Sequence, residues 1–137
     1  MPIQPYLFFE GRCEEALDFY ACALGANIDS LMRYSESPVP PPPDKLAPGS
    51  ENKIMHASLR IGDAVLMASD GLCPGEAGFR GFSLSLTVAD AAEADRIFAS
   101  LADRGQALRP LSETFRSPRF GMVADRFGVL WMVMVPR

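Results

Sequence analysis

One order of predicted elements occurs twice along this chain of 137 residues, and it constrains the fold more than any other feature. A strand, a helix and three further strands are followed by the same five elements again. The first set is predicted over residues 3–10, 13–24, 27–36, 53–61 and 64–69, and the second over 82–88, 91–102, 106–114, 119–124 and 129–135. Such a repeat determines the whole topology, so it is considered before any other assignment. Strands packed with helices on one face make the predicted class α+β.

Both predicted helices have signals at their ends. In the first, apolar residues recur at helical spacing over 13–24, and Gly25 follows as a C-terminal cap. In the second, Asp90 is a typical N-terminal cap, and Glu93 lies in the first turn, near the positive end of the helix dipole. We expect Gly105 to end this second helix.

The connections between elements are also marked in the sequence. Pro5 has no N–H and restricts the first strand to a sheet edge, a terminus or an irregular pairing. Gly62-Asp63 separates two apolar runs, as in a β-hairpin. Residues 37–50 hold six of the twelve prolines and are predicted to form a long extended loop. Segment 70–80 contains Gly and Pro and is predicted to join two modules. The predicted organisation is a single domain, 1–137, with module 1 at about 1–72 and module 2 at about 80–137.

Composition excludes several classes of protein. Hydrophobic residues make up 48% of the chain, which is enough apolar material for a packed core. The net charge of −4 argues against nucleic-acid binding, which needs a basic face. No apolar run approaches the roughly 18 residues of a membrane-spanning helix, and the first residues do not look like a signal peptide. Cys13, Cys22 and Cys73 form no metal-type pair, so reduced thiols in the cytoplasm are expected.

Several short blocks, taken in their order, resemble one known family. They are Pro5-Tyr6 with Phe9, 13–20 (CEEALDFY), 54–61 (IMHASLRI), 66–71 (LMASDG), Glu113-Thr114-Phe115, Phe120-Gly121 and 125–132 (DRFGVLWM). With the doubled order of elements, they make the chain similar to the vicinal-oxygen-chelate superfamily, which includes glyoxalase I, bleomycin-resistance proteins and extradiol dioxygenases. The resemblance is to its PhnB-like branch. It implies paired βαβββ modules that form a curved eight-stranded open barrel around a pocket, with helices on the outer face.

Enzymes of that superfamily hold a metal ion with four side chains, usually His, Gln or Glu, two from each half. The resemblance puts those positions at Pro5, Met67, Ser83 and Met132. Proline has no donor group, a thioether suits soft copper, and a lone serine hydroxyl is a poor ligand for Zn, Ni or Mn. We therefore expect no bound metal and no cofactor. Metal-dependent glyoxalase or dioxygenase chemistry is not expected either.

His56, the only histidine, is predicted to lie on one side of its strand with Ser58 and Arg60. The other side of that strand is apolar and is expected to meet a helix, so these three residues are expected to face the pocket. Seven residues are candidates for the ligand pocket: His56, Ser58, Met67, Ser69, Ser83, Ser85 and Met132.

Each candidate also has a structural alternative. His56 is a weak candidate for a catalytic base, because imidazole titrates near neutral pH, but it also suits a structural hydrogen bond. Asp70 polarises His56, binds a cationic ligand or shapes a turn. Met67 and Met132 either form an adaptable wall for an organic ligand or simply fill the interior.

Two further groups of residues are assigned from the second half. Trp131 points the opposite way from Met132 and is expected in the core. Arg109, Arg116 and Arg119 are close in sequence, and they either meet an anionic group or are solvated at the surface.

The sequence thus predicts a metal-free, PhnB-like protein that binds a small organic molecule and forms a cytoplasmic homodimer. Dimerisation is expected because relatives commonly pair and four-stranded sheets leave edges to cover. One alternative is an enzyme that uses His56 as a base or has a non-standard metal site near His56 and Asp70. Another is a structural dimer with a closed pocket. No nucleic-acid or membrane partner is expected, and no Gly-rich nucleotide loop supports S-adenosylmethionine chemistry.

Overall fold

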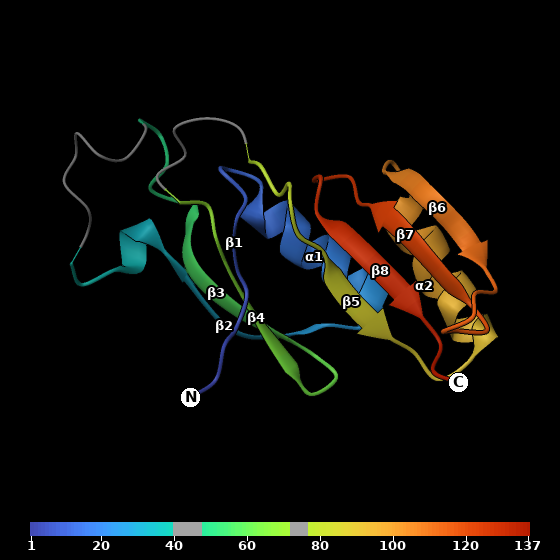
Figure 1. Cartoon of the computed structure of the whole chain (residues 1–137). Helices are drawn as coiled ribbons and strands as arrows, with labels where there is room; N and C mark the ends of the chain where they lie inside the picture. Colours follow the sequence, from blue (N-terminus) through green and yellow to red (C-terminus); the bar gives the residue numbers. More distant parts are fainter. Residues whose placement is uncertain (40–47, 72–76) are drawn as a thin grey trace. The chain divides into compact units, whose positions relative to one another are not determined.

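The computed structural model describes residues 1–39, 48–71 and 77–137, and within them it contains two α-helices and eight strands (Figure 1). The chain divides into two compact units, Met1–Ala77 and Gly78–Arg137. The division lies inside the predicted joining segment 70–80. In the described part of the chain, neither helix is long and apolar enough to cross a membrane. Cys73 and most of the proline-rich loop 37–50 lie outside the described residues.

The first unit is a four-stranded sheet with one helix. Its strands lie in the order β1-β4-β3-β2, with β1 parallel to β4 and the other pairs antiparallel. The proline-bearing start of the chain therefore leads into an edge strand, as predicted. The elements are β1 (Tyr6–Phe8), α1 (Cys13–Leu24), β2 (Asn27–Arg33), β3 (Ile54–Ile61) and β4 (Ala64–Ser69).

The second unit repeats this topology. Its strands lie in the order β5-β8-β7-β6, again with one parallel pair, and Figure 1 shows β8 between β5 and β7. The predicted α+β class and the doubled βαβββ order are therefore confirmed. The elements are β5 (Leu84–Thr87), α2 (Ala91–Ala102), β6 (Gln106–Ser112), β7 (Phe120–Ala124) and β8 (Leu130–Met134).

In each unit the helix packs on one face of its own sheet, and strand alternation decides which side chains are buried there. Leu7, Ala57 and Leu59 are buried in the first unit, together with Leu17 and Tyr20 of α1. The buried residues of the second unit are Val123, Trp131 and Val133 from the sheet and Ala94, Ile97 and Leu101 from α2.

Both helices begin and end at the predicted residues. Gly25 follows α1 in the left-handed conformation, with a φ of 67°. The Asp90 side chain accepts a hydrogen bond from the Glu93 N–H at the start of α2. The predicted role of Gly105 as the cap of this helix is wrong, because the C-terminal cap is Asp103, whose N–H donates to the Ser100 carbonyl oxygen. Gly105 instead allows a close approach, since a Cβ there would lie 2.3 Å from the backbone oxygen of Ala124.

Most strands are shorter than predicted. The first strand begins at Tyr6 and ends at Phe8, because the chain turns at Glu10, which has a φ of 50°. Residues 34–36 form a 3₁₀ turn instead of continuing β2, and the Arg33 N–H donates to the Glu36 side chain there. The strand predicted over 82–88 is only Leu84–Thr87, which leaves Ser83 just before it. Similarly, β6 ends at Ser112 rather than at residue 114.

Candidate functional site

A cavity of about 420 Å³ lies in the second unit, on β7 and β8 and beside the loop that joins β6 to β7. Four of its lining residues are apolar and large, and two carry guanidinium groups. The lining residues are Arg109, Thr114, Phe115, Arg116, Phe120, Met132 and Met134.

Strand alternation places the floor of this cavity on the side of the sheet away from α2. Met132 and Met134 are partly exposed, whereas their neighbours Trp131 and Val133 are buried in the core. Phe120 is the register partner of Met134 on the adjacent strand, so the two side chains lie next to each other. The buried Trp131 donates its indole N–H to Asp125, at 2.9 Å, as expected for a core residue facing away from Met132.

Hydrogen bonds hold the loop that forms one wall of the cavity. The buried Ser117 hydroxyl lies 2.7 Å from the Arg119 carbonyl oxygen and 2.6 Å from the Val135 carbonyl oxygen. The backbone N–H groups of Arg116 and Ser117 donate to the Thr114 hydroxyl. Arg137 donates to the Thr114 carbonyl oxygen at 2.6 Å. The wall is therefore tied to β8 and to the end of the chain.

The two cavity arginines contact aromatic rings. The guanidinium carbon of Arg109 lies 5.3 Å from the Phe120 ring centre, and that of Arg116 lies 5.4 Å from the Phe115 ring centre. These are cation–π distances. Arg119, the third arginine of the predicted cluster, instead forms an ion pair with Asp95 at 2.7 Å. Only two members of that cluster therefore reach the cavity.

Of the candidates in the second unit, only Met132 lines this cavity. Ser83 and Ser85 lie beside it in the fold, but their hydroxyl groups point to sulfur atoms, Ser83 to Met132 at 3.1 Å and Ser85 to Met134 at 3.9 Å. Phe115 and Phe120 also line the cavity; the sequence predicted no role for them, although both belong to the blocks that resemble the family.

The remaining candidates lie on one face of the first sheet. Met67 is in register with Tyr6 on one side and Ser58 on the other, and Ser69 is in register with Phe8. This is the face away from the buried residues that pack on α1. It carries every first-unit candidate: His56, Ser58, Met67 and Ser69.

Tyr6 and His56 form a hydrogen-bonded pair on that face. The Tyr6 hydroxyl lies 2.9 Å from His56 Nδ1, and the ring centres are 5.6 Å apart. Burial raises the pKa of the Tyr6 phenol, the nearby Cys13 raises it further, and a hydrogen bond with Ser69 partly offsets both effects. A neutral phenol donates this hydrogen bond when Nδ1 carries no proton.

Asp70 holds the backbone at the start of α1. One carboxylate oxygen accepts hydrogen bonds from the N–H groups of Gly11 and Cys13, at 2.9 and 2.7 Å, and the other accepts from Ile54 at 2.7 Å. These contacts occupy the carboxylate, while His56 bonds to Tyr6. The alternative in which Asp70 polarises His56 is therefore not what the geometry shows.

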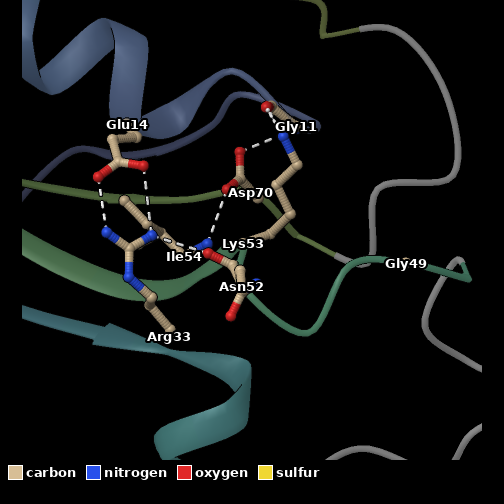
Figure 2. Close-up of a pocket in the computed structure, with 8 residues that line it drawn as sticks. All are labelled: Gly11, Glu14, Arg33, Gly49, Asn52, Lys53, Ile54 and Asp70. Carbon is tan, nitrogen blue, oxygen red and sulfur yellow. Dashed lines mark hydrogen bonds and ion pairs between the residues drawn. The ribbon is translucent and has the colours of Figure 1, made fainter.

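Asp70 also lines a second cavity, of about 370 Å³, which Figure 2 shows. Its charged residues mostly bond to one another or to backbone. Arg33 pairs with Glu14 at 2.6 Å, and Lys53 donates to the Gly11 carbonyl oxygen at 2.8 Å. The pairing with Arg33 lowers the pKa of Glu14. We therefore regard this cavity as a structural junction between α1, β2 and β3.

The residues at the superfamily's metal positions do not fit a Zn, Ni or Mn site. Pro5 and Met67 are neighbours, joined by a hydrogen bond of 2.9 Å from the Met67 N–H to the Pro5 carbonyl oxygen. In the second unit, the Ser83 hydroxyl points to the Met132 sulfur. A proline, two thioethers and one hydroxyl offer none of the imidazole or carboxylate donors that these metals prefer. In the described ranges, no group of three or more His, Cys, Asp or Glu side chains is placed to hold a metal ion.

A family model for 3-demethylubiquinone-9 3-methyltransferase matches residues 1–134. The chain belongs to this family. It is 35% identical to protein YjdN of Escherichia coli K12, over 98% of this chain and 95% of that protein. It is 41% identical to protein PA1353 of Pseudomonas aeruginosa, with a TM-score of 0.86 and coverage of 99% and 98% of the two chains.

One solved structure supports the predicted branch, and a more distant one supports the fold. The PhnB protein of Bacillus cereus is 30% identical, with a TM-score of 0.81 and coverage of 98% of this chain and 99% of that one. The fosfomycin resistance protein FosX of Mesorhizobium loti shares the fold alone, at 13% identity and a TM-score of 0.61, over 98% of this chain and 90% of that one. The predicted resemblance to the PhnB-like branch is confirmed.

Proposed function

We propose that this protein binds a small organic molecule in the cavity of its second unit, without the chelated metal typical of its superfamily. The observation that carries the proposal is the cavity itself, with its apolar floor of Phe120, Met132 and Met134. Its volume of about 420 Å³ is in the range of small-molecule sites, which are mostly apolar with a few polar groups. Methionine side chains adapt to ligands of different shape.

One observation favours binding over the methyl transfer in the family's name, and a second favours binding over metal-dependent chemistry. Each sheet has one parallel and two antiparallel strand pairs, unlike the parallel sheets that hold nucleotide cofactors at a switch point. The metal positions hold Pro5, Met67, Ser83 and Met132, which supports a role without a Lewis acid.

The test is a ligand screen by saturation-transfer-difference NMR, followed by affinity measurements on a matched pair of variants. Phe115 lines the cavity and is 86% exposed, so Phe115→Ala leaves the core intact. We expect it to weaken binding about fivefold or more, because the ligand loses an aromatic contact. Phe82→Ala removes an exposed phenylalanine of the same unit that does not line the cavity, and it should leave affinity unchanged.

Two results would count against this proposal. If no organic compound binds at millimolar concentration, the structural reading with a closed pocket becomes the better one. If Phe82→Ala weakens binding as much as Phe115→Ala, the ligand does not occupy this cavity.

A second candidate function is metal-free acid–base catalysis, and the Tyr6–His56 hydrogen bond favours it. A phenol and an imidazole in contact can exchange a proton with a bound substrate. The same NMR samples test this reading, since conversion of a ligand over hours is visible in its spectrum. If the ligand is converted by the protein and His56→Gln abolishes this conversion, the protein is a catalyst. Unchanged ligand spectra would contradict this candidate function.

A further inference from the structure

We propose that the second-unit cavity selects organic anions, that is, an oxyanion such as a carboxylate attached to a flat apolar body. This inference rests on the proposed function and adds the chemical class of the ligand. It follows from the two guanidinium groups at the cavity, their surroundings, and the charge of the unit that holds them.

The guanidinium groups of Arg109 and Arg116 have no carboxylate within ion-pair distance among the residues that the structure describes. Their contacts are with the rings of Phe120 and Phe115. An aromatic face holds a guanidinium in position without neutralising it, so its N–H groups stay available to an oxyanion.

Acidic side chains near the cavity form ion pairs with arginines that do not line it. Asp95 pairs with Arg119 at 2.7 Å, and Glu113 pairs with Arg137 at 3.2 Å. Glu113 is the acidic residue nearest to the cavity loop in sequence, and its partner Arg137 also ties that loop through the Phe115 carbonyl oxygen. The Glu113 carboxylate is therefore paired with Arg137 and not with an arginine of the cavity.

Charge is also distributed unevenly along the chain. Residues 78–137 contain eight arginines and six acidic residues, a net charge of +2. Residues 1–77 contain five basic and eleven acidic residues, a net charge of −6. The two cavity arginines therefore lie in the positive part of an acidic protein, which favours capture of an anion there.

The rest of the cavity requires an apolar group on the same ligand. An inorganic anion would meet the arginines but leave the rings and the methionine side chains of the floor in water. A flat apolar body covers Phe115, Phe120, Met132 and Met134 while its oxyanion reaches the guanidinium groups. The hydrogen bonds of the loop 114–119 hold the backbone of Arg116 beside the cavity without a ligand.

The experiment compares three probes with the same naphthyl body by NMR titration of the isotope-labelled full chain: 2-naphthoate, 2-naphthamide and 2-naphthylmethylamine. We expect the anion to bind about tenfold more tightly than the neutral amide, and the cation to bind more weakly still. Acetate should bind more weakly than 2-naphthoate, because it lacks the apolar body. The preference for the anion should fall in 0.5 M NaCl, since exposed charges are screened.

Variants that each remove one positive charge test which arginines cause the preference for the anion. Arg109→Gln and Arg116→Gln should each reduce the preference for 2-naphthoate over 2-naphthamide about threefold or more, with little effect on amide binding. Arg96→Gln, on the exposed face of α2, removes the same charge away from the cavity and should leave the preference unchanged.

The outcomes separate this inference from the proposed function. Equal affinity for all three naphthyl probes, with shifted signals at Met132 and Met134, overturns the anion selectivity and leaves small-molecule binding standing. An equal loss of preference in Arg96→Gln also overturns it, since the effect is then one of net charge. If the ligand screen finds another binder, failure of every naphthyl probe to bind overturns this inference alone; the absence of any binder in both experiments overturns both proposals.

Discussion

Cys13 and Cys22 lie on the same helix, and their environments differ sharply. Cys13 is fully buried at the first residue of α1, and its N–H donates to Asp70. Burial raises the pKa of its thiol far above the ordinary value, and the carboxylates of Asp70 and Glu14 raise it further. Cys22 is exposed. Because the thiolate is the reactive form, we expect Cys22 to be the more reactive of these two cysteines.

We predict that iodoacetamide modifies Cys22 about 100-fold or more faster than Cys13 in the native protein. A Cys73→Ser background removes the third thiol, and peptide mass spectrometry follows each site over time. In denaturant the two rates should become similar. Comparable rates in the native protein would show that Cys13 is not protected as the structure indicates.

At the scale of elements, α1 depends on a residue far away in the sequence. The side chain at its N-terminal cap position, Arg12, forms no capping hydrogen bond with the helix backbone, and Asp70, which follows β4, accepts from the Cys13 N–H instead. Asp70 is 1% exposed and joins β3, β4 and the start of α1 through three backbone N–H groups. In the second unit, Asp125 is likewise buried and accepts from the N–H groups of Phe127 and Val129.

We predict that Asp70→Ala lowers the free energy of unfolding by about 3 kcal/mol, because three buried N–H groups lose their acceptor. Urea denaturation followed by circular dichroism measures this change. Asp18→Ala is the matched control: it removes an exposed carboxylate from the same helix and should change stability by less than about 0.5 kcal/mol. Similar losses in both variants would mean that the Asp70 contacts contribute little.

At the scale of the whole molecule, each described sheet has two edge strands. The edge strands are β1 and β2 in the first sheet and β5 and β6 in the second. Apolar side chains are exposed along β2 and β6, namely Ile28, Leu31, Met32 and Leu108. Unpaired edges with apolar side chains favour pairing with another chain, so we propose that the protein is a homodimer.

This proposal predicts a mass of about 30 kDa by light scattering on a size-exclusion column at micromolar concentration, twice the 14.9 kDa of one chain. Dilution should shift the equilibrium toward single chains. A mass near 14.9 kDa at all concentrations would contradict the proposal.

Much of the fold could be predicted because it depends on local patterns. Helical spacing with Gly25 and Asp90 at the ends predicted both helices to the residue. Strand alternation placed Trp131 in the core and Met132 on the opposite side, where it lines the cavity. Strand ends were less predictable, since they depend on pairing between strands and on turns such as the one at Glu10.

The candidate site could be predicted only in part. Met132 was among the candidates, and Arg109 and Arg116 were recognised as an arginine cluster whose role was left open. Phe115 and Phe120 had no assigned role, because a loop residue and a strand residue become neighbours only when β6 and β7 pair and the loop between them is held in place.

The sequence by itself thus determined the doubled βαβββ order, the helices, the family and the absence of standard metal donors at four positions. Each of these depends on the identity or spacing of residues along the chain. Tertiary structure alone decided the partners of Asp70, which lie 57 and 59 residues away at Cys13 and Gly11. It also decided which arginines line the cavity and which are paired, because packing and hydrogen bonds between distant segments select among the contacts that a sequence permits.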